Sequence, residues 1–140
     1  MAGYWNDAAT TATVLREGWL RTGDMGYLDT EGYLFLAGRR SDMIKAGAHR
    51  IHPKDVEEAI QELEGVAEAA VVGIDDEILG QAIKAFVVPA PGHHLDPLRI
   101  KAHCRERLAQ YKIPKYVELI ERLPKTASGK IRRHELVQEP

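Results

Sequence analysis

Two apolar runs near the middle of the chain constrain its fold more than any other feature. EAAVVGI and AIKAFVV are each short enough to be a strand, and the stretch DDEILG lies between them. Short apolar runs separated by turn residues indicate neighbouring strands of one sheet. We therefore expect these segments, with YVELI as a third strand, to form the sheet on which the rest of the chain packs.

Helices are expected before and after these strands. Pro53 begins a helix that Gly65 ends, and its apolar residues recur every three or four positions. These apolar residues are Val56, Ala59, Ile60 and Leu63. Asp96 as N-cap and Pro97 in the first turn begin a second helix, and residues 132–137 form the last one. Helix, two strands, helix and strand in this order make a compact α+β unit.

The N-terminal part is expected to be a separate hairpin. Asn6 or Asp7 caps a short helix, and MGYLD and GYLFLAG then form two strands joined by a type I turn from Asp29 to Gly32. No clean period marks the stretch RRSDMIKAGAHRIH, which we interpret as a connector. The expected fold class is α+β: an N-terminal β-hairpin followed by a small sheet of about three strands packed with helices.

The composition limits the size of the core, the cellular location and the kinds of site that we expect. With 140 residues, 44% of them hydrophobic, the chain is expected to bury one modest core. No apolar run approaches the roughly 18–20 residues of a membrane span and no signal peptide is recognisable, so we expect a cytoplasmic location. Cys104 shares an apolar register with Ile100 and Leu108, which predicts a core residue rather than a nucleophile. His49 and His52 lack a third ligand nearby in sequence, so no metal site is expected.

The net charge of −2 hides an uneven distribution. Every charged residue from Asp55 to Glu77 is acidic, whereas basic residues gather between Arg39 and Lys54 and again between Arg122 and Arg133. Two separated basic segments are able to converge on a phosphorylated small molecule, and the alternative is two solvated surfaces. No nucleic-acid partner is expected.

The second basic segment contains PKTASGKIRR, whose Gly-Lys pair looks like part of a phosphate-binding loop. A P-loop needs an earlier glycine, separated from the pair by four residues, and a Ser or Thr directly after the pair. Pro124 and Ile131 occupy those positions, so the P-loop interpretation fails and the pair needs another explanation.

Three segments, taken in order, resemble a known family: GWLRTGDMGYLDTEGYLFLAGRRSDMIK, GAHRIHPKDVEEAI and LPKTASGKIRR. They look like the C-terminal part of the adenylate-forming enzymes, which include acyl- and aryl-CoA ligases, luciferases and the adenylation domains of peptide synthetases. In that family a small C-terminal lid closes over a large domain that carries the phosphate-binding loop and acyl pocket. By this resemblance, residues 1–24 are the tail of a missing large AMP-binding domain, residues 25–40 a hairpin leading to the hinge, and residues 41–140 the lid.

The resemblance implies roles for four residues when a carboxylate is joined to the α-phosphate of ATP. Lys130 matches the family's catalytic lysine, which stabilises negative charge at the reacting phosphorus. Asp24 matches the ribose ligand, Arg39 an arginine at the ribose and phosphate, and Arg50 is a candidate contact for a phosphate of ATP or CoA. The structural alternatives are a helix-start lysine, a capping aspartate, a surface salt bridge and a solvated arginine.

A hinge and a thiol channel are also implied by the resemblance. Ser41 falls where the family pivots its lid between an adenylating and a thioester-forming orientation. Lys45, Gly47, Ala48 and His49 are candidates to line the pantetheine channel of CoA in the second orientation. Ala48 replaces a glycine that is usual in the family, so the chain departs from the family pattern in the part expected to receive the thiol acceptor.

The resemblance therefore implies the lid of an AMP-forming acyl-CoA ligase that uses ATP (or AMP) and CoA and acts on a small carboxylic acid. Mg²⁺ is expected with ATP but bound by the missing domain. The expected partner is that N-terminal AMP-binding domain, in cis or as a separate chain, and the isolated chain is expected to be inactive. A chain that starts in the large domain's tail fits either a chosen fragment boundary or a split gene.

Two other functions stay open. The chain is alternatively the lid of an adenylation domain that serves a carrier protein, or a stand-alone nucleotide- or protein-binding module without catalysis. With the large domain missing, Trp5, Trp19, Leu20 and Val14 are expected to be partly exposed or covered by another chain, so self-association through the N-terminal tail is a candidate.

Overall fold

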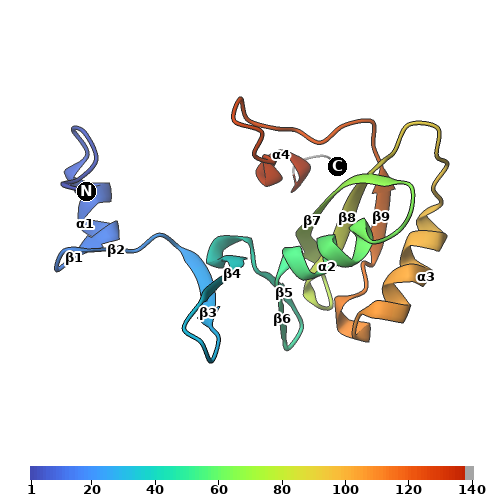
Figure 1. The fold of residues 1–140 in the computed structure, drawn as a ribbon, viewed down its shortest axis with the longest axis horizontal. Helices are drawn as coiled ribbons and strands as arrows, with labels where there is room; N and C mark the ends of the chain where they lie inside the picture. The colour runs from blue at the N-terminus through green and yellow to red at the C-terminus, as the bar shows by residue number, and fades with distance from the viewer. Residues whose placement is uncertain (138–140) are drawn as a thin grey trace. The chain divides into compact units, whose positions relative to one another are not determined.

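The structure, a computed structural model, describes residues 1–137 (Figure 1). The chain divides into two compact units, one from Met1 to Ser41 and one that begins at Asp42. The second unit contains the two apolar runs and all the helices expected around them.

A five-stranded sheet forms the centre of the second unit. β7 (Val66–Asp76) pairs antiparallel with β8 (Gly80–Pro89), as the two apolar runs predict. β9 (Tyr116–Leu119) joins β8 in parallel, and β5 (Ile44–Ala46) meets the start of β8 through Ala46 and Gly80. β6 (His49–Ile51) completes the sheet beside β5.

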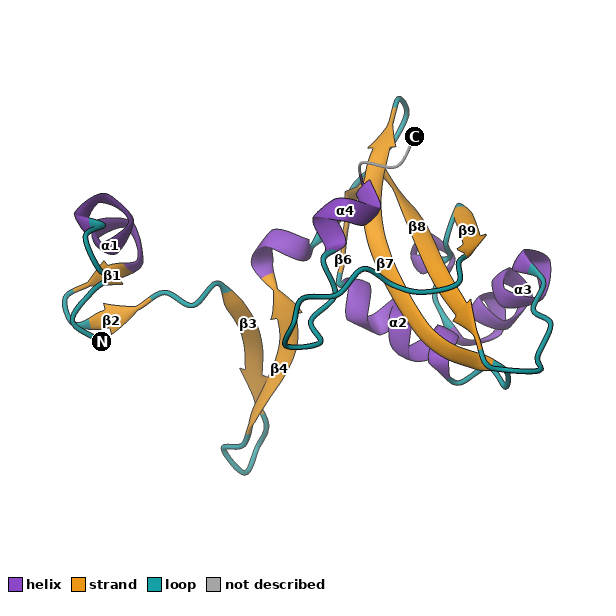
Figure 2. Ribbon diagram, turned by 90° about the horizontal axis from the view of Figure 1, so that it is seen from above, coloured by secondary structure: helices purple, strands orange, loops and turns teal. Residues whose placement is uncertain are grey.

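Helices begin where proline and capping residues place them. α2 (Pro53–Gln61) starts with its proline, and α3 (Pro97–Arg107) follows Asp96, whose side chain accepts a hydrogen bond from the Leu98 N–H. A 3₁₀ turn, η2 (Gln110–Lys112), leads to β9. The last helix, α4 (Arg133–Val137), lies against β7 (Figure 2).

The sheet buries apolar side chains on both faces. Alternate residues of a strand point to opposite faces, so Ala69 and Val71 pack in the cluster with α2 and α3, and Val72 packs in the other cluster with α4. The first cluster is the larger one and contains, among others, Ile44, Ile51, Val56, Ile60, Ile83, Val87, Ile100 and Cys104. The second contains Ala70, Val72, Phe86, Leu123 and Leu136. A sheet covered on both sides explains why β7 and β8, its two long strands, are apolar at consecutive positions.

The first unit consists of short elements. They are α1 (Ala8–Val14), β1 (Leu15–Arg16), β2 (Trp19–Leu20), β3 (Asp24–Leu28) and β4 (Leu34–Arg39). Asp7 caps α1 by accepting from the Thr10 N–H, and the Gly32 N–H donates to the Asp29 carbonyl in the expected turn. Tyr27 stacks on Phe35 across the β3–β4 hairpin.

Large apolar side chains of the first unit are exposed. Trp5 is 93% exposed, Trp19 is 80% exposed and Leu20 is 43% exposed, while Val14 is half-buried. The hairpin strands are likewise exposed at Tyr27, Leu28, Tyr33, Leu34, Phe35 and Leu36. The expected exposure of the N-terminal tail is therefore observed, and the hairpin extends it.

The α+β class is confirmed, but the expected sheet of about three strands was too small. The supposed connector contains a 3₁₀ turn, η1 (Arg40–Asp42), and both β5 and β6. These two strands have three residues each, too short for a visible alternation, although Ile44, Ala46 and Ile51 are buried. Cys104 is fully buried as expected, and burial raises the pKa of its thiol. No helix within the described residues is long and apolar enough to cross a bilayer.

The packing of α4 on the sheet gives a first prediction. Leu136 is 3% exposed whereas its neighbour Val137 is 48% exposed. Leu136→Ala should lower the free energy of unfolding by about 2–4 kcal/mol, because it removes a buried side chain and leaves a cavity. Val137→Ala should change it by less than about 0.5 kcal/mol. Urea denaturation of both variants tests this, and equal small losses would mean that α4 is not docked.

Candidate functional site

The Gly-Lys pair lies at the end of a tight, hydrogen-bonded loop. Lys125 and Ile131 form a β-bridge, and within it the Thr126 N–H donates to the Lys130 carbonyl at 2.8 Å. The Gly129 N–H donates to the Thr126 carbonyl, and the Lys130 N–H donates to Thr126 Oγ1. Gly129 has φ 82°, a left-handed conformation that favours glycine. The backbone at Lys130 is therefore fixed by its own loop.

The Lys130 side chain differs from those of the neighbouring basic residues. Lys125 pairs with Glu68, Arg132 with Glu135 at 2.8 Å, and Arg133 with Glu57. Lys130 is exposed, and among the described residues no carboxylate forms an ion pair with it. Its ammonium group is thus presented to solvent on a pinned loop, available to an anion.

The first unit brings Asp24 and Arg39 together. They are cross-strand partners at the open end of the β3–β4 hairpin, and Arg39 Nε lies 3.3 Å from Asp24 Oδ1. Thr22 Oγ1 accepts from the Asp24 N–H, and the Gly23 carbonyl accepts from the Arg40 N–H. An exposed ion pair of this kind contributes only about 0–1 kcal/mol to stability. Its polar atoms remain accessible to a ligand.

The β5–β6 hairpin carries the candidate channel residues. Lys45 and Arg50 are direct cross-strand partners and both are exposed, so two like charges face one side. Like charges placed opposite each other are unfavourable unless an anion or solvent screens them. Gly47 occupies the first of two turn positions with φ 58°, and its N–H donates to the Leu79 carbonyl. Ala48, at the second position, does not have a positive φ, which explains why alanine is acceptable there.

His49 is held on the other side of this hairpin. Its ring stacks on Tyr111 with 4.0 Å between ring centroids and an interplanar angle of 8°. Tyr111 belongs to η2, and the next residue, Lys112, pairs with Asp55 at the start of α2. The ring stacking holds His49 of β6 against η2, and both residues remain exposed.

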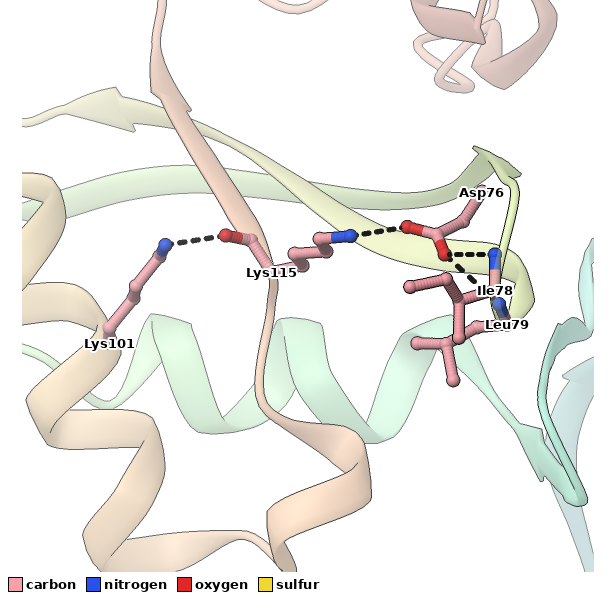
Figure 3. Close-up of polar contacts among 5 residues, drawn as sticks. All are labelled: Asp76, Ile78, Leu79, Lys101 and Lys115. Carbon is pink, nitrogen blue, oxygen red and sulfur yellow. Dashed lines mark hydrogen bonds and ion pairs between the residues drawn. The ribbon is translucent and has the colours of Figure 1, made fainter.

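The turn between β7 and β8 supports Gly47 through a polar cluster (Figure 3). Asp76 Oδ1 accepts from the backbone N–H groups of Ile78 and Leu79, and Asp76 Oδ2 accepts from the Lys115 ammonium. Lys101 donates to the Lys115 carbonyl on the far side. The hydrogen bond from Lys115 is the main cause that lowers the pKa of Asp76 to about 2, assisted by the Leu79 N–H. Since Leu79 accepts from Gly47, Asp76 orders the turn on which the candidate channel rests.

Ser41 lies in η1 and is the last residue of the first unit. The boundary between the two compact units therefore follows the residue expected to act as hinge. Within residues 1–137, no group of three His, Cys, Asp or Glu side chains is arranged to hold a metal ion.

Sequence reasoning missed three polar groups around these residues. Glu57 is buried on α2 and bonds both to the Val71 N–H and to Arg133. Its only sequence indication is its position three residues before Ile60, on the edge of the apolar face of α2. Asp76 and Lys115 are far apart in sequence, so their pairing has no local pattern.

The chain is similar to known proteins. The family model of the AMP-binding enzyme C-terminal domain matches residues 55–130. The long-chain-fatty-acid–CoA ligase of Bacillus subtilis is 50% identical over 139 residues, which are 99% of this chain and 25% of the ligase. The indoleacetate–CoA ligase of Aromatoleum aromaticum is 44% identical over 138 residues, 99% of this chain and 27% of that protein.

Solved structures agree with these relatives. The o-succinylbenzoate CoA synthetase of Bacillus subtilis, in complex with its acyl-adenylate intermediate, superposes with a TM-score of 0.91 at 38% identity. That match covers 100% of this chain and 28% of the synthetase. An amide bond synthetase from Marinactinospora thermotolerans matches with a TM-score of 0.90 at 40% identity, covering 97% of this chain and 28% of that chain. The chain thus spans about a quarter of the length of the proteins that it matches.

The Asp76 cluster predicts a defined dependence of stability on pH. Because the folded-state pKa is about 2, below the ordinary 3.8, ionised Asp76 stabilises the fold fully above pH 3.8. That contribution is lost as the pH falls from 3.8 towards about 2. The Tm difference between wild type and Asp76→Asn should therefore be constant from neutral pH down to about 3.8 and shrink below it.

Asp75→Asn is the matched control, because Asp75 is the exposed neighbour. Thermal unfolding followed by circular dichroism across this pH range measures both differences. A wild-type to Asp76→Asn difference that grows on acidification would contradict the assignment.

Proposed function

Because the chain belongs to the AMP-binding enzyme C-terminal domain family, we propose that it is the lid of an AMP-forming acyl-CoA ligase and that Lys130 is its catalytic lysine. The first half-reaction joins a carboxylate to the α-phosphate of ATP and expels pyrophosphate. Negative charge gathers around the phosphorus in the transition state, where a preorganised cation stabilises it. Lys130 would supply that cation when the lid closes.

The proposal rests on the exposure of the Lys130 side chain, with which no carboxylate forms an ion pair among the described residues. Three neighbouring basic residues have carboxylate partners within the chain, while Lys130 is exposed on a loop held by the Lys125–Ile131 bridge and by hydrogen bonds to the Thr126 carbonyl and hydroxyl. Because the backbone at Lys130 is already held, only the side chain loses conformational freedom when the ammonium group meets a phosphate, and none of the ion pairs of the neighbouring basic residues has to break. A lysine that served only to begin a helix would not need such a loop.

The other candidate residues take parts in nucleotide and CoA binding. We assign Asp24 to the ribose hydroxyls, since an ionised carboxylate only accepts hydrogen bonds, and Arg39 to ribose and phosphate. The like-charged pair of Lys45 and Arg50 is suited to a phosphate of CoA or of the nucleotide. Gly47, Ala48 and His49 would line the pantetheine channel beside it.

The proposal requires a large AMP-binding domain in addition to this chain. The relatives are about four times as long as the part matched, and the exposed hairpin of the first unit offers an apolar surface to cover. That domain, in cis or as a separate chain, would supply the acyl pocket and hold Mg²⁺ with ATP. A small carboxylic acid as substrate and a cytoplasmic location, where ATP and CoA are available, belong to the same proposal.

A second acceptor class deserves testing because of one relative. The matching protein of Marinactinospora thermotolerans is an amide bond synthetase, although its fold matches with a TM-score of 0.90. The lid fold therefore accompanies more than one named activity, and the acceptor of the acyl group is open to a carrier-protein thiol as well as to CoA. Thioester formation measured with CoA and with a phosphopantetheinylated carrier protein separates these two.

Lys130→Ala should separate the two half-reactions. In a chimaera where this chain replaces the matching quarter of the Bacillus subtilis ligase, the variant should lose a factor on the order of 10² to 10³ in adenylation, about the effect of removing one preorganised donor. Thioester synthesis from supplied acyl-adenylate should stay within several-fold of the parent, because the rotated lid holds Lys130 away. Pyrophosphate release and CoA-thioester formation measure the halves.

Arg122→Ala is the control for this experiment, since Arg122 is exposed and has the same charge, whereas Lys125 is occupied by Glu68. It should leave both half-reactions nearly unchanged. The chain on its own should release no pyrophosphate. Equal losses in both halves for Lys130→Ala, or the same loss for Arg122→Ala, would leave the loop as an ordinary basic surface.

Ser41→Pro tests the hinge. Proline fixes φ near −65° and removes a backbone donor, so it should favour one lid orientation over the other. In the same chimaera, one half-reaction should fall by at least about 10-fold more than the other. Thr30→Pro, an exposed position in the Asp29–Gly32 turn of the first unit where proline is well tolerated, is the control for the introduction of a proline. A Ser41→Pro variant with equal losses in both halves would exclude residue 41 as the pivot.

A further inference from the structure

A buried carboxylate connects three elements of the second unit. Glu57 lies on α2 and is only 8% exposed. Its Oε1 accepts from the Val71 N–H of β7 at 2.8 Å and from Arg133 Nη2 of α4 at 2.6 Å. A buried carboxyl group is costly unless it is paired and hydrogen-bonded, so these two donors offset the burial of Glu57 and fix its position. One oxygen atom thus ties α2, the outer edge of β7 and the start of α4.

Arg133 connects this anchor to the Lys130 loop. It lies three residues after Lys130 and begins α4. Between them, the Arg132 N–H donates to the Pro124 carbonyl and closes the base of the loop. The segment from Lys130 to Arg133 is therefore held at both ends, by the loop's own hydrogen bonds and by Glu57.

The same guanidinium also lies near Asp42, another residue of the second unit. Arg133 Nη1 lies 3.9 Å from Asp42 Oδ2, and Asp42 is the first residue of the second unit, directly after Ser41. At 3.9 Å this is an attraction between charges, weaker than the 2.6 Å hydrogen bond to Glu57. Arg133 lies between the residue that follows the hinge and the loop that carries Lys130.

We propose that Arg133 is a positioning residue for Lys130, and that the Glu57–Arg133–Asp42 contacts make the Lys130 loop turn as one rigid body with the residue after the hinge. The consequence for catalysis rests on the proposed function, whereas the fixing of the loop does not. A 1 Å displacement of a catalytic group costs up to about 10²-fold in rate, so the position of an exposed lysine has to be enforced.

Stability alone is a poor explanation for this cluster. Replacing a buried ion pair with apolar side chains is often neutral or stabilising, and α4 already has Leu136 as an apolar anchor. The Arg133 guanidinium even leaves its Nε buried without a hydrogen-bond partner in the described part of the chain. The Glu57–Arg133 pair instead fixes one position for the segment from Lys130 to Arg133.

The first test uses the 140-residue chain itself and compares Arg133→Met with Arg132→Met. Arg132 is the matched control because it has the same charge, precedes Arg133 in the sequence and forms an ion pair with the nearby Glu135 of α4. In Arg133→Met, the backbone order parameters of Gly129 and Lys130 should fall from about 0.85 towards 0.6, while those of β7 and β8 stay unchanged. Arg132→Met should leave the loop rigid. Glu57→Gln keeps an acceptor for Val71 and should loosen the loop less than Arg133→Met.

The second test is a double-mutant cycle in the chimaera. Arg133→Met should slow adenylation by about 10- to 100-fold and leave thioester formation within several-fold. In a Lys130→Ala background it should add less than about 2-fold, because its effect passes through Lys130. A purely structural residue would lower the rate by the same factor in both backgrounds.

The outcomes are distinguishable. The positioning role is wrong if the order parameters of Gly129 and Lys130 do not fall in Arg133→Met. It is also wrong if those of β7 and β8 fall by the same amount. Independent effects in the cycle overturn it as well. If Lys130→Ala itself leaves adenylation intact, the proposed function fails, and the order parameters alone decide whether Arg133 fixes the loop.

Discussion

The second unit depends on the antiparallel pairing of β7 with β8. These long strands are apolar at consecutive positions, so both faces of the sheet must be covered. α2 and α3 cover one face, and the other is left for Leu123 and the short helix α4. The chain consequently has to return across the sheet after β9, and that return carries the loop with Lys130. The position of the candidate catalytic lysine is thus a consequence of the need to bury Ala70, Val72 and Phe86.

The outer edge of β7 adds a second requirement. An unpaired strand edge exposes backbone donors, and within the described residues β8 is the only strand paired with β7. The Glu57 carboxylate accepts a hydrogen bond from the Val71 N–H at this edge, and it also pairs with Arg133. Edge protection, the anchoring of α4 and the fixing of the Lys130 loop are therefore served by the same carboxylate.

How much of this was predictable follows from the range of each interaction along the chain. Local chemistry identified the helix starts at Pro53 and Asp96, and the apolar runs identified β7 and β8. β5 and β6 escaped detection because three-residue strands that carry Lys45 and Arg50 show no usable period. Asp24 and Arg39 were singled out separately, yet their cross-strand register emerges only from the hairpin. Glu57 with Arg133, and Asp76 with Lys115, join residues far apart in sequence, which no local pattern encodes.

The way α4 is docked also bears on the order in which the unit is built. Leu136 and Arg133 bind surfaces made by β7, β8 and α2, all of which precede them in the chain. A five-residue helix has too few turns to be stable before it meets those surfaces. We therefore expect α4 to form only together with its docking on the sheet and on α2. Local unfolding of residues 133–137 should then cost less free energy than unfolding of the sheet, so the segment that follows the Lys130 loop is expected to open first.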